Sequence, residues 1–128
     1  MLGRILLVDD DFSYANSFKA VMEDAGYEVN YISCAVEAIK EYAKTPLDFD
    51  MVIAEYMSGG FEGLDSFKLI SILKGINKSL KCIFLTSSSN EEIEIKALEM
   101  SADRFISKDK SLKVITHYVD DLMRRLRR

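Results

Sequence analysis

The stretch Ile5-Leu6-Leu7-Val8-Asp9-Asp10-Asp11 joins four consecutive apolar residues directly to three consecutive carboxylates. A short apolar run without alternation is typical of a strand that is buried on both faces of a parallel sheet. The change to acidic residues after Val8 predicts that the strand ends there, at an edge of the sheet that solvent can reach. We therefore expect a buried first strand whose carboxyl end carries a group of acids.

Further strand-like segments follow along the chain. Residues 49–54 and 82–85 are apolar runs, 105–106 is a weaker one, and 27–31 alternates apolar and polar residues as an edge strand does. Between them, apolar residues recur with helical spacing. The five stripes are Ala15, Phe18, Met22 and Ala25; Val36, Ile39 and Ala43; Leu64, Phe67, Ile70, Leu73 and Ile76; Ile93, Ala97 and Met100; and Leu112, Ile115, Val119, Leu122 and Leu126. This alternation predicts an α/β fold, a flavodoxin-like (βα)5 doubly wound parallel sheet with strand order 2-1-3-4-5.

The composition is that of one globular domain. The chain has 128 residues, of which 48% are hydrophobic and 30% charged, and its formal net charge is -4. We expect a single domain over residues 1–128 in a reducing, cytoplasmic compartment, because no apolar run is long enough to span a membrane and Cys34 and Cys82 make no disulfide framework. The acidic balance argues against a nucleic-acid surface on the domain itself. The arginine-rich end at 124–128 is either a solvated helix end, a linker stub towards an effector domain, or a contact for an acidic partner.

Chemistry-bearing side chains follow the predicted strands where each one ends. In a doubly wound sheet, ligands bind beyond the carboxyl ends of the strands, near the switch point between strands 1 and 3. The residues expected there are Asp9–Asp11, Glu55, Thr86–Ser89 and Ser107-Lys108. Adjacent carboxylates favour a hard cation such as Mg²⁺, and a hydroxyl and an ammonium group can hold phosphoryl oxygens. The pattern indicates a Mg²⁺-dependent phosphoryl site without a nucleotide-binding loop, since the glycine-rich stretch 58–63 lacks a lysine.

Three motifs, Ile5–Asp11, Ile83–Thr86 and Ala102–Lys108, together resemble a response-regulator receiver domain of two-component signalling. The resemblance covers essentially the whole chain, in order and at the family's spacing. In that family an aspartate at the end of the third strand accepts a phosphoryl group from a histidine kinase.

The resemblance implies roles for individual residues of this chain. The matching positions are Asp9 and Asp10 for the acidic pair that binds Mg²⁺, Thr86 for the switch hydroxyl, Lys108 for the lysine that contacts the phosphoryl group, and Phe105 for the switch aromatic. Mg²⁺ could also be held by Asp10 and Glu55 with the backbone carbonyl of Met57. We expect this binding to be weak or absent if Glu55 pairs with Lys108 instead.

The main departure from the family is at the phosphoacceptor position, where Glu55 stands in place of aspartate. Asp50 falls at the start of the same strand, on the opposite rim. The proline that usually follows the family's lysine is replaced by Asp109, so we expect either a trans peptide bond there or a strained cis bond that is retained. The family's Met-Pro pair after the third strand is replaced by Ser58-Gly59.

The extra methylene of Glu55 moves its carboxylate outward by about 1.5 Å. A misplacement of about 1 Å can slow an attacking group on the order of 100-fold. The same extension brings the carboxylate nearer to Lys108 and Thr86. Two hypotheses follow: Glu55 partly mimics the phosphorylated state, or it simply pairs with Lys108, and in both cases the output does not require phosphate.

The leading functional prediction is an atypical pseudo-receiver, not an enzyme, that acts in a phosphorelay by protein–protein contact. The expected partner is a histidine kinase or an output domain, bound through the face formed by the fourth helix (93–100), the fifth strand (105–106) and the fifth helix (112–126). We expect a monomer or a weak homodimer, without membrane contact. One alternative is a Mg²⁺-dependent phosphoryl-transfer or phosphatase unit that uses the acidic rim. Another is a flavin binder, although Asp9–Asp11 would repel a flavin phosphate.

Several of these residues also have simpler structural interpretations. Asp11 and Ser89 are candidate helix N-caps, and the hydroxyls from Thr86 onward could serve the same purpose. Phe105 could belong to the core instead of acting as a switch. The remaining interpretations are Cys82 as buried core, Cys34 near the start of the second helix, and the single histidine, His117, as a surface or half-buried residue.

Overall fold

The computed structural model describes residues 1–45, 48–56, 65–87, 91–100 and 102–126. Within them lies a five-stranded sheet of order β2-β1-β3-β4-β5 in which every neighbouring pair is parallel. The strands are β1 (Gly3–Val8), β2 (Tyr27–Ile32), β3 (Met51–Glu55), β4 (Lys81–Thr86) and β5 (Arg104–Ser107). The predicted flavodoxin-like order is confirmed, and the alternating strand β2 lies at an edge.

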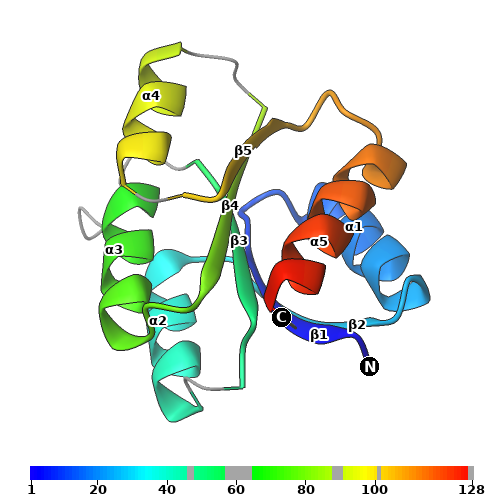
Figure 1. Ribbon diagram of the computed structural model, residues 1–128, viewed down its shortest axis with the longest axis horizontal. Helices are drawn as coiled ribbons and strands as arrows, with labels where there is room; N and C mark the ends of the chain where they lie inside the picture. Colours follow the sequence, from blue (N-terminus) through cyan, green and yellow to red (C-terminus); the bar gives the residue numbers. More distant parts are fainter. Residues whose placement is uncertain (46–47, 57–64, 88–90, 101, 127–128) are drawn as a thin grey trace.

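Helices cover both faces of this sheet (Figure 1). They are α1 (Phe12–Asp24), α2 (Ala35–Lys44), α3 (Ser66–Ile76), α4 (Glu91–Glu99) and α5 (Leu112–Leu126). Helices α1 and α5 pack on one face, and α2, α3 and α4 on the other (Figure 1). Each strand of the interior therefore contributes to two apolar clusters, one per face. This explains why β1, β3 and β4 are continuous apolar runs.

Helix α1 begins and ends where its sequence signals indicate. Asp11 is its N-cap, and one carboxylate oxygen accepts a hydrogen bond from the Tyr14 backbone N–H at 3.1 Å. The chain leaves the helix through Gly26, whose φ of 104° lies in the left-handed region that favours glycine. The N-cap predicted for Asp11 is confirmed, and it fixes the start of α1 directly after the acidic stretch.

The predicted buried stripe of α2 was wrong by one position. The buried residues are Ala35, Ala38 and Tyr42, whereas Ala43 is exposed. The reason is Tyr42, whose ring stacks on Phe49 with centroids 5.8 Å apart. Burying this large ring removes more apolar surface from water than burying an alanine methyl, and it turns the helix accordingly.

Smaller corrections apply to the other stripes. Ile76, at the last turn of α3, is exposed, and Leu69, which the predicted stripe did not include, is buried. Ala25, predicted in the first helical stripe, is the C-cap residue that follows α1 and is only half-buried. The strand predicted at 49–54 is observed at 51–55, because Phe49 packs on Tyr42 before the strand begins.

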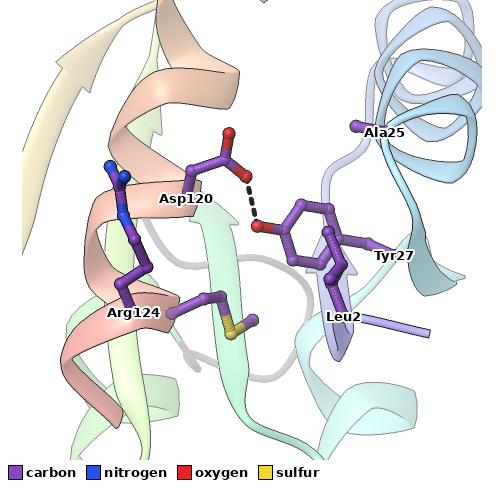
Figure 2. A pocket seen from close by; sticks show the side chains of 6 residues that line it. Leu2, Ala25, Tyr27, Asp120 and Arg124 are labelled. Carbon is purple, nitrogen blue, oxygen red and sulfur yellow. Dashed lines mark hydrogen bonds between the residues drawn. The ribbon is translucent and has the colours of Figure 1, made fainter. Parts of the chain in front are cut away.

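The basic end lies at the rim opposite to the predicted site. There the Tyr27 hydroxyl of β2 donates a hydrogen bond to the Asp120 carboxylate of α5 (Figure 2). Both side chains line a cavity of about 260 Å³, together with Arg124 of the basic end. Arg125 forms an ion pair with Asp121 at 3.1 Å. The described part of the basic end therefore packs as the last turn of α5, and Arg127 and Arg128 lie outside the described residues.

Other single-residue predictions have mixed outcomes. Cys82 is buried, Cys34 is the N-cap residue of α2, and His117 is exposed, as expected. Asp50 lies at the start of β3, where its carboxylate accepts a hydrogen bond from the Arg4 backbone N–H at 2.9 Å. The predictions for Met57, Ser58–Gly63, Leu64 and Ser89 fall outside the described residues. Among the described helices, none is both long and apolar enough to cross a membrane.

Candidate functional site

The sheet order brings the ends of β1 and β3 together. Val8 and Ala54 are register partners, so Asp9 and Glu55 come one residue later on adjacent strands. Helix α1 follows β1 on one face of the sheet, and α3 follows β3 on the other. The chain therefore leaves the two strands in opposite directions, which opens the switch point where ligands bind in folds of this kind.

Asp9 is a fully buried carboxylate with 0% exposure. One oxygen accepts a hydrogen bond from the Asp11 backbone N–H at 2.8 Å, and the other lies 2.9 Å from the Lys108 ammonium nitrogen. The Tyr31 hydroxyl donates to the Asp9 backbone carbonyl at 2.8 Å, which ties the end of β1 to β2. A buried charge needs such partners, and Lys108 is the only cationic one that the described residues provide here.

Glu55 is also buried, and its carboxylate forms an ion pair with the same lysine. The Ser66 hydroxyl of α3 donates to the Glu55 backbone carbonyl at 2.6 Å, which fixes the end of β3. Burial, together with the neighbouring carboxylate of Asp9, raises the pKa of Glu55 from 4.5 to about 7, although Lys108 acts in the opposite sense. Two buried carboxylates share one ammonium group, so one negative charge is not balanced by Lys108.

Lys108 joins the two carboxylates and is itself only 8% exposed in its side chain. Its backbone N–H donates to the Thr86 carbonyl at 2.8 Å, which anchors the end of β5 to the end of β4. Burial alone would lower the pKa of the lysine, but the hydrogen bonds and charges of Glu55 and Asp9 raise it overall. The lysine therefore stays protonated, and its pairing with Glu55 agrees with one of the two sequence hypotheses.

The Ser87 hydroxyl lies 3.5 Å from one carboxylate oxygen of Glu55, at the limit of a hydrogen bond. Thr86, the residue singled out in the sequence, is buried at the end of β4. Its predicted role as the switch hydroxyl stays a prediction. Ser87 belongs to the hydroxyl-rich stretch that the sequence placed at this site. The sequence alone does not show how the hydroxyls of Thr86 and Ser87 are oriented relative to Glu55.

Tyr14 is a neighbour of the site that the sequence analysis missed. The centroid of its ring lies 4.3 Å from the Lys108 ammonium nitrogen. The signal for it was weak: Tyr14 and Phe18 are four residues apart in α1, and their rings pack with centroids 6.4 Å apart. An aromatic side chain at this spacing is usually a core residue. Nothing in the sequence shows that it faces Lys108, the residue that follows β5.

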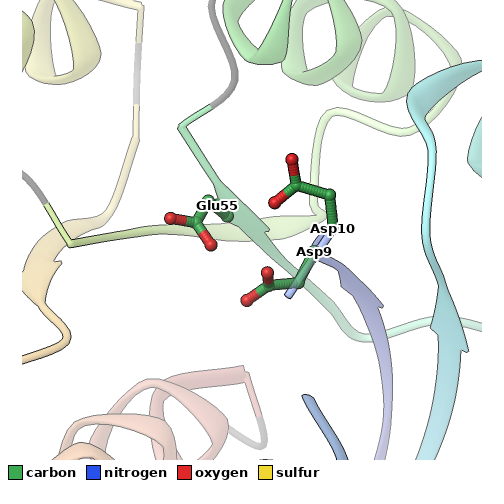
Figure 3. Close-up of side chains that lie close together, drawn as sticks. All are labelled: Asp9, Asp10 and Glu55. Atoms are coloured by element: carbon green, nitrogen blue, oxygen red, sulfur yellow. The ribbon is translucent and has the colours of Figure 1, made fainter. Parts of the chain in front are cut away.

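The acidic residues fit a divalent cation in donor type and spacing. Asp9, Asp10 and Glu55 each offer a carboxylate oxygen, and these three atoms lie within 4.8 Å of one another (Figure 3). Oxygen ligands of this kind are those that Mg²⁺ prefers. Asp10 is exposed, whereas Asp9 and Glu55 already contact the Lys108 ammonium group. A cation that used all three would therefore compete with Lys108, and the further ligand predicted from Met57 lies outside the described residues.

Phe105 lies in β5 as the register partner of Phe84 and is half-buried against the cluster formed with α2, α3 and α4. Its surroundings agree with a core residue at the edge of that cluster. The switch role stays a prediction. The bond between Lys108 and Asp109 is trans, as expected.

Comparison with known proteins identifies relatives of this chain. The family model of the response regulator receiver domain matches residues 5–120. The chain is 30% identical over 123 residues to the regulatory protein VanRB of Enterococcus faecalis, which covers 95% of this chain and 53% of that protein. It is 28% identical over 129 residues to the phosphate regulon transcriptional regulatory protein PhoB of Klebsiella pneumoniae, with 98% and 54% covered. The chain thus spans about half the length of these curated relatives.

Solved structures agree on the fold. A receiver domain protein from Methanospirillum hungatei superposes with a TM-score of 0.87 at 24% identity, covering 99% of this chain and 98% of that one. The non-phosphorylated HemR receiver domain of Leptospira biflexa gives 0.84 at 26% identity, with 94% of each chain covered. The BeF3-activated receiver domain of RstA from Klebsiella pneumoniae gives 0.83 at 23%, with 94% and 98% covered. Since the family model spans most of its length, this chain belongs to the response regulator receiver domain family.

Proposed function

We propose that this receiver domain is a pseudo-receiver, which takes part in two-component signalling through protein contacts and without phosphorylation of Glu55. The observation that carries the proposal is the position of the Lys108 ammonium group, buried between the carboxylates of Glu55 and Asp9. A receiver that accepts phosphate needs its lysine for the incoming phosphoryl oxygens. Here the lysine already has an anionic partner that belongs to the chain itself.

The length of Glu55 supports the same conclusion. Its carboxylate extends from the end of β3 far enough to contact a lysine at the end of β5, across the intervening strand β4. An aspartate at this position would end about 1.5 Å short of that point. The extra methylene therefore places the Glu55 carboxylate against Lys108 and displaces it from the position of a nucleophile.

The acidic cluster would hold Mg²⁺ through the side chains of Asp9, Asp10 and Glu55, where the ion would supply a positive charge for phosphoryl oxygens. Because Lys108 already contacts two of these three carboxylates, we propose that this binding is weak. The residues of this chain that act without the ion are Asp9 and Glu55, which orient the lysine, and Lys108, which keeps its proton.

The decisive experiment compares the wild type with Glu55→Asp and Glu55→Gln in the presence of acetyl phosphate and Mg²⁺. We expect only Glu55→Asp to gain a phosphoryl group, because its carboxylate is withdrawn from Lys108 and returned towards the position of in-line attack. The wild type is expected to react at least about 100-fold more slowly. Intact-mass spectrometry, before and after mild base, measures the acyl phosphate. A base-labile phosphoryl group on Glu55 of the wild type would contradict the proposal.

We propose that the output surface is the face formed by α4, β5 and α5. Support comes from large apolar side chains that are exposed there: Ile95 and Leu98 on α4, and Val114 and Tyr118 on α5. Exposed apolar groups gathered on neighbouring elements favour a protein partner, for which a histidine kinase or an output domain remains our proposal. That the domain is not an enzyme, is monomeric or weakly dimeric, and is cytoplasmic also remains a prediction.

A further inference from the structure

Tyr14, in the first turn of α1, lies against the Lys108 ammonium group, with its ring centroid 4.3 Å away from the nitrogen. An ammonium group within about 6 Å of an aromatic centroid is attracted to the negative face of the ring. Among the described residues, Lys108 therefore contacts the carboxylates of Asp9 and Glu55 and the aromatic ring of Tyr14. Unlike the two carboxylates, the ring carries no charge and offers a metal ion no oxygen ligand.

The position of this ring is fixed from the side of α1. The Tyr14 backbone N–H donates to the Asp11 carboxylate at 3.1 Å, which caps the helix at this turn. The ring itself packs with Phe18, a fully buried residue one turn later in the same helix. A side chain held by both the cap and the core offers Lys108 a rigid contact.

The hydroxyl of Tyr14 does not explain why a tyrosine is found here. Its oxygen is buried and has no hydrogen-bond partner among the described residues. Burial, with the charges of Asp9, Glu55 and Asp11, raises the pKa of Tyr14 to about 12, so the phenol is neutral at physiological pH. A buried hydroxyl without a partner is unfavourable for folding. The favourable contribution at this position therefore comes from the ring, and phenylalanine should replace it without loss.

We propose that Tyr14 is a positioning residue that retains Lys108 on Asp9 and Glu55 and so keeps the acidic cluster closed to cations. The inference rests on the proposed pseudo-receiver function and names the part of the chain that stabilises the closed state. To bind Mg²⁺ through Asp9 and Glu55, the site must release Lys108 from at least one of these carboxylates. The ring contact opposes that release, because a displaced ammonium group loses the aromatic face as well as the carboxylate.

The test compares Tyr14→Leu, which removes the aromatic face, with Tyr14→Phe, which keeps it. Phe12→Leu is the control, because it removes another aromatic ring from the first turn of α1, one that is exposed and packs with Tyr31 at 6.3 Å between ring centroids. The first measurement is the exchange rate of the Lys108 ammonium protons with water by NMR, with the signal assigned by its loss in Lys108→Met. The second is a Mg²⁺ titration of the whole chain followed by NMR shifts.

We expect slow ammonium exchange in the wild type, in Tyr14→Phe and in Phe12→Leu, and exchange about fivefold faster in Tyr14→Leu. Mg²⁺ should bind about fivefold more tightly to Tyr14→Leu, the factor expected when a typical cation–π contact is lost. Equal exchange rates in Tyr14→Leu and the wild type would overturn the inference, and so would a wild type whose Lys108 protons exchange freely.

A folding defect is separated from this effect by thermal unfolding of each variant. If Tyr14→Leu does not fold, Tyr14→Met provides a flexible apolar replacement without an aromatic face. Failure of the proposed function gives a different result, namely phosphorylation of Glu55 in the wild type, which is measured with Tyr14 intact. The two ideas can therefore fail separately.

Discussion

Glu55, Asp9 and Lys108 form a cluster in which two buried carboxylates share a single ammonium group. When both acids are ionised, the cluster carries one uncompensated negative charge at the end of the sheet. Burial of such a charge is unfavourable unless a proton or a cation joins it. The protonation of Glu55 is thus expected to affect the stability of the folded domain.

The first prediction concerns the pH dependence of stability. The pKa of Glu55 is raised from 4.5 to about 7, so the folded chain holds this proton more tightly than the unfolded chain. The resulting contribution to stability is fully present below pH 4.5 and is lost as the pH rises through about 7. For this shift the loss amounts to about 3 kcal/mol.

The variant Glu55→Gln isolates this effect, because glutamine has a similar size and does not ionise. Urea unfolding of the wild type and of Glu55→Gln at pH 5 and pH 8 measures it. We expect the variant to gain stability relative to the wild type between the two pH values. An unchanged difference between the two pH values would mean that Lys108 dominates and that the pKa of Glu55 is not raised, because Glu55 would then be ionised in both the folded and the unfolded chain throughout this range.

At the scale of the elements, α1 connects the fold to the site, since its cap and first turn follow the acidic stretch. Asp11→Ala removes the side chain that accepts the Tyr14 N–H, which should destabilise the domain by about 1 kcal/mol. Asp65→Ala is the matched control, because Asp65 caps α3 by the same contact, with the Lys68 N–H at 2.9 Å. Chemical unfolding should show similar losses for both variants and almost none for Asp11→Asn. A much larger loss for Asp11→Ala alone would show that Asp11 does more than cap the helix.

The elements also show what the sequence could and could not predict. The strands and their order could be predicted from the apolar runs, because a strand that is buried on both faces consists almost entirely of apolar residues. The face of α2 was misjudged because Tyr42 has a polar atom, yet its ring is fully buried on Phe49. Asp9, Glu55 and Lys108 could be placed at one rim because they end neighbouring strands. The contact of Tyr14 with Lys108 depends on how the first turn of α1 lies relative to the residue that follows β5, and no local pattern contains that information.

At the scale of the whole molecule, Lys108 is connected to the proposed output face through β5. Its backbone bonds to Thr86 at the end of β4, and at the other end of β5 Arg104 forms an ion pair with Asp121 of α5 at 3.4 Å. Arg104 also lies over the ring of Tyr118, which is exposed on α5. A change in the position of Lys108 could therefore reach this surface along one strand. If the two ends of β5 are coupled, a change at Lys108 produces a measurable response at this surface.

The last prediction tests this link with beryllofluoride, an analogue of a phosphoryl group on an aspartate. In Glu55→Asp with Mg²⁺, beryllofluoride should bind the shorter carboxylate, attract Lys108, and shift the backbone NMR signals of Ile95, Leu98 and Tyr118. In the wild type we expect no such shifts at the same concentrations, because Glu55 already occupies Lys108. Glu55→Gln with beryllofluoride controls for nonspecific binding. If the wild type responded as Glu55→Asp does, Glu55 would still leave room for an anion beside Lys108, and the domain would be a switchable receiver instead of one held in a single state.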